Sequence, residues 1–299
     1  MYQIRKLAEC TLNQALLAWN RGFEGYFFDA KMDVDRFTAR IGKESISADL
    51  SIVAFDGEEP IGLLLSGYKN IGNELIAWNG GTGVASSHRR KGVGKLLVDK
   101  ACELYLQKGI KTSTLEAISE NKQAISLYES RGYKVVDEVI HLTLETPVDF
   151  EDSLDYQPVY SSSQASQFLP LYQHDTPWQS QWWCMKDGQL IQLLGNEGET
   201  VAYALFKKQY SADGTLNSIV VTHCFIEENL SNTNKVLEAL FSNLFPPSAT
   251  TYQCTIAFFQ TSNEVVYKYL KTKGFNKKVG QVWMKKPISI EVSGNIKHS

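Results

Sequence analysis

The chain has few cysteines and histidines, and their spacing suits neither disulfide pairing nor metal binding. Its five cysteines (Cys10, Cys102, Cys184, Cys224 and Cys254) are odd in number and widely separated, and none belongs to a C-x-x-C pair. This spacing excludes a disulfide framework and the usual zinc motifs, and it favours reduced thiols that pack as small apolar side chains. The five histidines are equally dispersed, so we expect no bound metal.

Excess positive charge and long apolar runs are also missing. The 30 Lys and Arg residues are outnumbered by 33 Asp and Glu residues, and the net charge of −3 excludes the basic field typical of nucleic-acid-binding proteins. No apolar run approaches the roughly 18 residues of a membrane span. The start, MYQIRKLAEC, lacks the apolar core of a secretion signal. These absences predict a cytoplasmic protein that binds neither nucleic acid nor membrane.

The most informative segment that is present, VASSHRRKGVGKL at residues 84–96, combines cations with glycines before a predicted helix. Glycine at Gly92 and Gly94 lets backbone N–H groups approach a bulky anion, and a helix N-terminus adds about half a positive charge. Arg89, Arg90 and Lys91 would add charge-assisted hydrogen bonds to the same anion. The segment therefore predicts a pyrophosphate-binding loop; a cation-rich surface turn is the plainer alternative.

Two other phosphate-binding motifs are excluded by particular residues. A P-loop requires Ser or Thr after its Gly-Lys pair, whereas Lys95 is followed by Leu96. A dinucleotide-binding loop requires a third glycine, which is missing after Gly94. The loop therefore belongs to neither of these two classes of phosphate-binding motif.

A second segment, LEAISENKQAISLYESRGY at residues 115–133, completes the pattern. It predicts a strand end, a turn at Asn121, a helix with apolar residues at i, i+3 and i+4 spacing, and a helix-terminating Gly132. An Arg-x-x-Gly-x-Gly loop after a strand ending in Val, followed at this distance by Asn, Leu-Tyr and Gly-Tyr, resembles the GNAT family of N-acetyltransferases. The resemblance covers the first half of the chain.

Strands and helices alternate in this half, which indicates a sheet covered by helices. Periodicity and turn residues predict strands at 2–7, 51–55, 61–68, 74–84, 112–118 and 135–144, and helices at 12–28, 34–41, 95–106 and after Asn121. The resemblance implies an α/β (α+β) fold with a mixed, mostly antiparallel, twisted sheet flanked by helices.

The resemblance also implies direct transfer of an acetyl group from acetyl-CoA to a neutral amine. The residues implied to hold the coenzyme are Val84, Arg89, Arg90, Lys91, Gly92, Val93, Gly94, Lys95 and Asn121. In this scheme the Val84 N–H polarises the thioester carbonyl, Tyr128 protonates the departing thiolate, and Glu116 is a general base acting through water. Each role has a plainer alternative: Tyr128 packed on its helix, Glu116 solvated or salt-bridged, and Asn121 as a helix cap.

Three glycines at 80, 81 and 83 precede Val84. They either leave room beside the strand for the thioester or mark a bulge without chemistry.

The second half repeats the spacing of the first. Asn263 and Gly274, in TSNEVVYKYLKTKGF, follow Asn121 and Gly132 by 142 residues. Strands at 201–207, 216–225 and 252–259 and a helix at 235–245 repeat the element order. Since 299 residues suit two domains, we predict a catalytic GNAT domain at 1–147, a degenerate GNAT-like domain at 158–288 and a flexible tail at 289–299.

The degenerate half lacks the phosphate loop. Its equivalent segment, IEENLSNTN at residues 226–234, has two carboxylates and no cation or glycine, and Leu270 stands in the place of Tyr128. Because carboxylates repel a pyrophosphate, we expect one coenzyme A site per chain. The second domain would then be a scaffold or a wall over the acceptor site.

The sequence defines the acceptor of the acetyl group less well than it defines the coenzyme site. Aromatic and acidic residues between 19 and 29 suit a cationic amine, although their helical spacing equally suits a core stripe. Trp178 and Trp182, expected on a helix begun by Asp175-Thr176-Pro177, would line the acceptor cleft or pack an interface. The predicted function is N-acetyl transfer to a small amine or a peptide amine, by a monomer or homodimer. The alternative is a non-catalytic acyl-CoA-binding sensor or regulatory protein.

Overall fold

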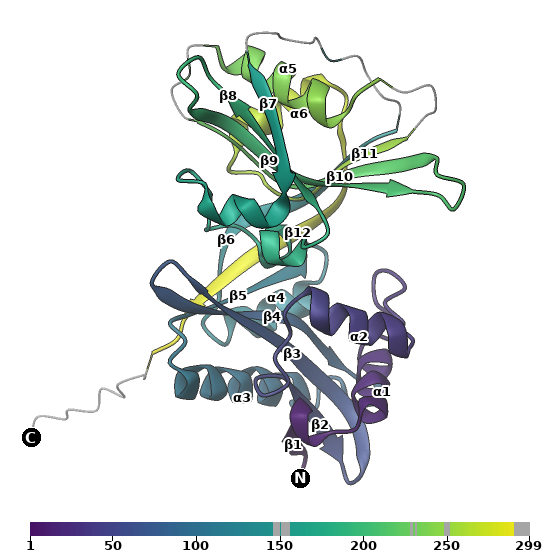
Figure 1. Cartoon of the computed structure of the whole chain (residues 1–299). Helices are drawn as coiled ribbons and strands as arrows, with labels where there is room; N and C mark the ends of the chain where they lie inside the picture. Colours follow the sequence, from purple (N-terminus) through teal and green to yellow (C-terminus); the bar gives the residue numbers. More distant parts are fainter. Residues whose placement is uncertain (146–149, 151–155, 228–229, 231, 248–251, 290–299) are drawn as a thin grey trace, which may run out of the picture. The chain divides into compact units, whose positions relative to one another are not determined.

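The computed structural model describes residues 1–145, 150, 156–227, 230, 232–247 and 252–289. The chain divides into two compact units (Figure 1). The first comprises Met1–Leu115, Asn121–Lys134 and the residues from Met284; the second comprises Glu116–Glu120 and Val135–Trp283. The predicted boundary at residue 147 and residues 290–299 of the predicted tail lie outside the described residues, and the domain boundaries stay predictions.

The first unit is built on a sheet with the strand order β1-β2-β3-β4-β5, in which only the β4–β5 pair is parallel. The strands are β1 Gln3–Lys6, β2 Ile52–Asp56, β3 Glu59–Ile71, β4 Glu74–Val84 and β5 Thr112–Ile118. The helices are α1 Leu12–Gly22, α2 Val34–Lys43, α3 Val93–Lys108 and α4 Lys122–Glu129. The predicted strand–helix alternation and the predicted mixed sheet are confirmed.

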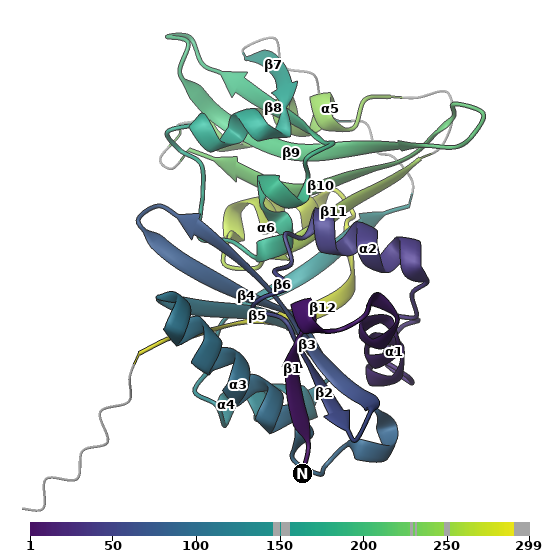
Figure 2. The same cartoon turned by 60° about the horizontal axis from the view of Figure 1, so that its bottom comes forward.

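Helices α1 and α3 cover opposite faces of this sheet (Figures 1 and 2). A Cβ at Gly83 would lie 2.9 Å from the ring of Phe23, directly after α1, whereas Val84, on the other face, approaches Gly94 of α3. Because side chains alternate between the two faces of a strand, alternate residues of β4 face α1 and the residues between them face α3.

Helix α1 is shorter than predicted. It ends at Gly22 because the chain turns there: Gly25 has a φ of 69°, and Arg89 binds the carbonyls of Gly22 and Glu24 at 3.3 and 2.8 Å. The aromatic residues that continue the helical spacing from Phe23 to Phe28 therefore belong to a loop.

The second unit has the strand order β12-β6-β11-β10-β9-β8-β7, with β10 and β11 parallel. Its strands are β6 Lys134–Leu144, β7 Gln157–Ser162, β8 Gln189–Leu194, β9 Thr200–Tyr210, β10 Leu216–Ile226, β11 Gln253–Gln260 and β12 Asn276–Pro287, and its helices are α5 Thr233–Leu244 and α6 Glu264–Thr272. Ala204 and Phe206 of β9 face the core under α5 and α6, whereas Tyr203 and Leu205 pack on the opposite side.

The predicted helix through Trp178 and Trp182 is wrong. Two single 3-10 turns, Trp178–Ser180 and Trp182–Cys184, replace it, and Gln181 between them is extended. The Gln181 amide donates to the His174 carbonyl at 2.7 Å and accepts from the Tyr172 hydroxyl at 2.8 Å. These buried hydrogen bonds hold Gln181 in an extended conformation, so the two tryptophans do not lie on one helix despite their i, i+4 spacing.

The internal repeat is present in the backbone itself. The Tyr133 N–H donates to the Tyr128 carbonyl and the Phe275 N–H to the Leu270 carbonyl, both at 3.1 Å and 142 residues apart. Gly132 and Gly274 have φ values of 86° and 88°. A strand bulge leaves Gly80 unpaired in β4 and Thr222 unpaired in β10, again 142 residues apart.

Candidate active site

The predicted phosphate loop leads directly into helix α3. Gly92 is the N-cap with a φ of 86°, and the Leu96 N–H is bonded to the Gly92 carbonyl at 3.0 Å. The N–H groups of the preceding first turn, at Val93, Gly94 and Lys95, have no partner within the helix because of its geometry. They lie at its positive end, where an anion is favoured.

The two loop glycines serve different purposes. No atom lies within 4 Å of where a Gly92 Cβ would be, so this position requires glycine for its positive φ and not for space. A Cβ on Gly94 would lie 3.2 Å from the Leu127 side chain. Gly94 therefore lets α3 pack closely on α4.

The loop cations also divide into two groups. Arg90, Lys91 and Lys95 are exposed, and within the described part of the chain none of them makes an ion pair. Arg89 instead donates from Nε to the Val84 carbonyl at 3.0 Å and from Nη2 to the end of α1. Arg89 thus orders the loop, and the other three cations face solvent beside the helix N-terminus.

The end of β4 turns one backbone donor away from its neighbour β3. The Ala85 N–H donates to the Ile61 carbonyl at 2.7 Å, and Val84 pairs with Gly62. Because donors alternate in direction along an antiparallel strand, the Val84 N–H points away from β3. On that side, β5 pairs with β4 only from Ile76 to Asn79.

The β4 glycines mark a bulge and a close helix contact. Gly80 is the bulged residue, and its carbonyl accepts from Arg40 at 2.6 Å. A Cβ at Gly81 would lie 3.2 Å from Trp19, and one at Gly83 would lie 3.0 Å from Gly22. The glycines therefore let α1 approach β4 closely, and the strand has the bulge that was one of the two expectations for this segment.

Tyr128 lies at the same bulge, 6% exposed. Burial raises the pKa of its hydroxyl to about 12, partly opposed by hydrogen bonds from the Thr82 and Asn79 side chains. Those two residues are bonded to each other, Asn79 Nδ2 to Thr82 Oγ1 at 2.9 Å. Tyr128 is therefore protonated and surrounded by neutral hydrogen-bonding groups.

Asn121 caps α4, with its Oδ1 accepting from the Ala124 N–H at 3.1 Å. It also forms a side-chain hydrogen bond with Tyr26, whose pKa is raised by burial. The helix-cap role is thus observed, and the cap links the loop after α1 to the start of α4.

Glu116 and His88, the latter a residue of the loop itself, are bound to other partners. Glu116 belongs to the second unit, where its carboxylate accepts from the Trp178 N–H at 3.4 Å, so the first unit alone does not assemble Glu116 with Tyr128. His88 contacts the Asp56 carboxylate at 3.3 Å and the Ser87 hydroxyl at 2.9 Å on the surface.

A cavity of about 450 Å³ lies in the loop between α1 and α2. Three aromatic residues line it together with two acidic and two basic residues: Phe23, Tyr26, Phe28, Glu24, Asp29, Arg21 and Lys31. The aromatic and acidic residues singled out in the sequence thus line a hollow, although Trp19 is buried and stacked on Phe23 at 4.1 Å.

Sequence reasoning missed Asn79 and Thr82, the polar neighbours of Tyr128. Their signal was two polar side chains among the glycines of the otherwise apolar β4, in the run N-G-G-T-G. Among the described residues, no cluster of His, Cys, Asp and Glu side chains suits a metal, and no helix is long and apolar enough to cross a membrane.

Comparison with known proteins gives a family for the first part of the chain. Residues 13–133 match the sequence model of the acetyltransferase (GNAT) family. No protein of curated function matches the chain in sequence.

Solved structures resemble the chain over nearly its full length. A tandem GNAT protein from the clavulanic acid biosynthesis pathway has a TM-score of 0.61 at 11% identity, covering 97% of this chain and 98% of that one. GCN5-related N-acetyltransferases from Sphaerobacter thermophilus (TM-score 0.60, 12% identity, 96% of both chains) and Anabaena variabilis (0.63, 13%, 97% of this chain and 74% of that one) share the fold. Residues 13–133 are therefore a GNAT-family domain, and the whole chain has the fold of a tandem GNAT protein.

Proposed function

We propose that the first unit transfers an acetyl group from acetyl-CoA to an amine, with Tyr128 as the general acid. The observation that carries the proposal is the protonated Tyr128 beside the β4 bulge, in the same unit as a glycine-capped helix start flanked by exposed cations. A protein that only bound the coenzyme would need the helix start but not a buried acid.

The residues at the start of α3 fit a pyrophosphate. The positive φ of Gly92 and the unpaired first-turn N–H groups make an anion site, and Arg90, Lys91 and Lys95 supply the charge. Arg89 contributes indirectly by holding the loop through three carbonyls. Asn121 and the backbone from Val84 to Gly94 complete the proposed coenzyme contacts.

The chemistry assigned to this chain is limited to orientation and proton handling. The Val84 N–H, turned away from β3, is positioned to donate to a thioester carbonyl on that side of β4. Tyr128 keeps its proton at neutral pH because its pKa is about 12, so its hydroxyl is available to donate a hydrogen bond to sulfur as negative charge develops there. Complete proton transfer to a thiolate, whose conjugate acid has a pKa of about 8.5, is uphill from a phenol of this pKa. Glu116 stays the proposed general base.

The acceptor is proposed to be a small amine or a peptide amine. The cavity between α1 and α2 offers three aromatic rings, whose faces attract ammonium groups. Its two carboxylates are balanced by Arg21 and Lys31 in the same lining, so the support for an amine comes from the rings. The amine must lose a proton before it attacks, so activity should rise with pH.

The first experiment is release of free thiol from acetyl-CoA across a panel of polyamines, aminoglycosides, amino acids and short peptides, beside calorimetric binding of coenzyme A. Turnover with any amine supports the transferase. Binding without turnover on the panel favours the alternative, a non-catalytic acyl-CoA sensor. The absence of binding contradicts both.

A further inference from the structure

The bulge in β4 brings two polar side chains onto one face of the strand. Asn79 pairs with Ser66, and Gly81 pairs with the neighbouring residue of β3, so one residue of β4 is extra in this ladder. Residues three apart on a regular strand point to opposite faces, and an extra residue between them reverses this alternation. Because of the bulge at Gly80, Thr82 therefore lies on the same face as Asn79.

The face that carries Asn79 and Thr82 is the one that packs on α3. Ser66, which lies opposite Asn79, is bonded through its hydroxyl to the Tyr105 hydroxyl of α3 at 2.7 Å. Tyr128, from α4, reaches the same pair and forms hydrogen bonds with both side chains. The bulge of β4 and the helix α4, which belong to one unit, thus meet at the Tyr128 hydroxyl.

The amide of Asn79 has a fixed orientation, because its Oδ1 accepts from the Gly81 N–H at 3.1 Å. Its Nδ2, a pure donor, faces Thr82 Oγ1 at 2.9 Å, and the Thr82 hydroxyl lies 3.1 Å from Oδ1. Burial raises the pKa of Tyr128, and the bonds from Thr82 and Asn79 lower it in part, as donors to a phenol oxygen do. The Tyr128 oxygen therefore accepts on the side of β4, and its own hydrogen stays available for another acceptor.

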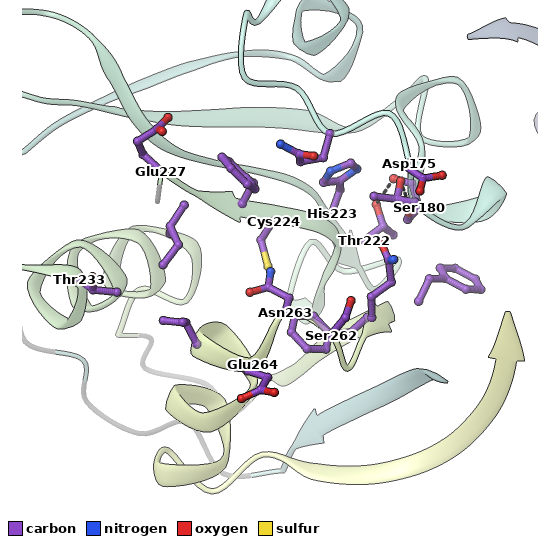
Figure 3. A pocket seen from close by; sticks show the side chains of 18 residues that line it. Asp175, Ser180, Thr222, His223, Cys224, Glu227, Thr233, Ser262, Asn263 and Glu264 are labelled. Carbon is purple, nitrogen blue, oxygen red and sulfur yellow. Dashed lines mark hydrogen bonds between the residues drawn. The ribbon is translucent and has the colours of Figure 1, made fainter. Parts of the chain in front are cut away.

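The second unit keeps the bulge, at Thr222 of β10, but loses all three polar groups. At the offset of 142 residues their positions are occupied by Val221, Cys224 and Leu270. Figure 3 shows Cys224, the counterpart of Thr82, on the wall of a cavity of about 760 Å³ in that unit. The same bulge thus forms without the polar pair, so the fold of the strand does not by itself require Asn79 and Thr82.

We propose that Asn79 and Thr82 are positioning residues for Tyr128, which donate to its phenol oxygen and leave its O–H free for the reacting sulfur. The proposal rests on the acetyltransferase function, because that function assigns the sulfur to Tyr128. As Tyr128 donates to the sulfur, negative charge grows on the phenol oxygen, and hydrogen bonds to a charged oxygen are stronger than bonds to a neutral one. The pair thus makes the Tyr128 hydroxyl a stronger donor.

Thr82→Val is the variant that tests the pair, since it removes the hydroxyl and keeps the β-branched shape that suits a strand. Thr82→Ser is the conservative variant that keeps the hydroxyl. Thr114→Val is the matched control, because the Thr114 hydroxyl in the neighbouring strand β5 is also buried but donates to the Ala77 carbonyl at 3.3 Å. Asn79 is less suited to the test, since its replacement also releases the Gly81 N–H.

The first measurement is the ionisation of residue 128, with 3-fluorotyrosine placed there in each full-length variant and followed by fluorine NMR against pH. The fluorine lowers the pKa of the phenol and so makes the titration accessible. We expect Thr82→Val to raise this pKa by about one unit, the effect of losing one hydrogen bond to a charged group. Thr82→Ser should titrate close to the parent, and Thr114→Val should titrate as the parent does.

The second measurement is thiol release from acetyl-CoA with a reactive amine. Thr82→Val should lower kcat by about tenfold, with KM for acetyl-CoA nearly unchanged. Thr82→Ser should recover most of the lost kcat, and Thr114→Val should turn over as the parent does.

Both effects of Thr82→Val are required. A pKa of residue 128 that does not move overturns the proposal, as does a kcat that stays at the parent's level or falls equally in Thr114→Val. If the parent releases no thiol with any amine, the acetyltransferase function fails, and the role of the pair toward sulfur fails with it. A parent that turns over while Thr82→Val leaves the pKa and kcat unchanged overturns the positioning role alone.

Discussion

Tyr128 and Tyr133 provide a matched pair for testing the proposed acid. Both are buried, and their rings meet edge to face with centroids 5.8 Å apart, but the Tyr133 hydroxyl is bonded to Ser113 at 2.7 Å. We predict that Tyr128→Phe lowers kcat by about 100-fold, the usual size of a general acid–base contribution, with KM for acetyl-CoA nearly unchanged. Tyr133→Phe should keep kcat and lose about 1 kcal/mol of stability. Parent-like turnover in Tyr128→Phe removes Tyr128 from the mechanism.

His223 provides a residue-level prediction of acid stability. Its pKa is lowered from 6.5 to about 4 by burial, so below pH 6.5 the unfolded chain binds a proton that the folded chain refuses. The stability linked to His223 is therefore complete above pH 6.5 and is lost as the pH falls towards 4, by up to about 3 kcal/mol. Urea unfolding of His223→Gln should show a shallower decline than the parent between pH 6.5 and 4. Parallel declines would contradict the assignment.

At the scale of elements, α1 is held against β4 by two glycines in contact. A Cβ on Gly22 would lie 2.8 Å from the Gly83 backbone, whereas a Cβ on Gly42 of α2 meets nothing within 4 Å. We predict that Gly22→Ala costs about 1–3 kcal/mol of unfolding free energy through overpacking. Gly42→Ala should stabilise by about 0.5–1 kcal/mol, since alanine favours the helix. Thermal unfolding of the two variants tests both predicted changes in stability. An unchanged stability of Gly22→Ala would show that α1 and β4 can move apart at little cost.

The prediction of helices and strands from the sequence succeeded where the hydrophobic periodicity and the turn and capping residues agreed. Strands β4 at Glu74–Val84 and β5 at Thr112–Ile118 have the predicted bounds. It failed where tertiary contacts decided: Arg89, distant in sequence, sets the end of α1, and the Gln181 anchor breaks the tryptophan segment. Strand β8, Gln189–Leu194, was not predicted.

The site was predictable to a similar extent. A helix start with glycines and cations is a local feature of the sequence, so the phosphate-binding loop at residues 84–96 could be predicted from the sequence. Arg89 binds the carbonyls of Gly22 and Glu24, and Tyr128 meets Asn79 and Thr82. These contacts join residues 46 or more positions apart and have no local signal.

For the whole molecule, the stoichiometry of coenzyme binding is the measurable consequence of one intact and one degenerate half. At the offset of 142 residues, Arg89, Arg90 and Lys91 correspond to Ser231, Asn232 and Thr233, so these three cations have no counterpart, and the first turn of α5 holds a single cation, Lys235. We predict one coenzyme A per full-length chain by calorimetry. Arg90→Glu/Lys91→Glu should abolish that binding, while Lys100→Glu/Lys108→Glu, the same charge change farther along α3, should retain it.

The positive charge of the loop at residues 84–96 is the reason why only the first unit is expected to bind the coenzyme. A pyrophosphate at the first unit gains from charge-assisted hydrogen bonds, each worth about 1.5–3 kcal/mol, which Asn232 and Thr233 cannot supply. Two equal sites per chain would mean that the second unit binds the coenzyme with the single lysine Lys235 at its helix start and without counterparts of the three loop cations. One site that survives Arg90→Glu/Lys91→Glu would move the coenzyme away from α3. Loss of that site in this variant alone, with the α3 control intact, assigns the coenzyme to the loop at residues 84–96.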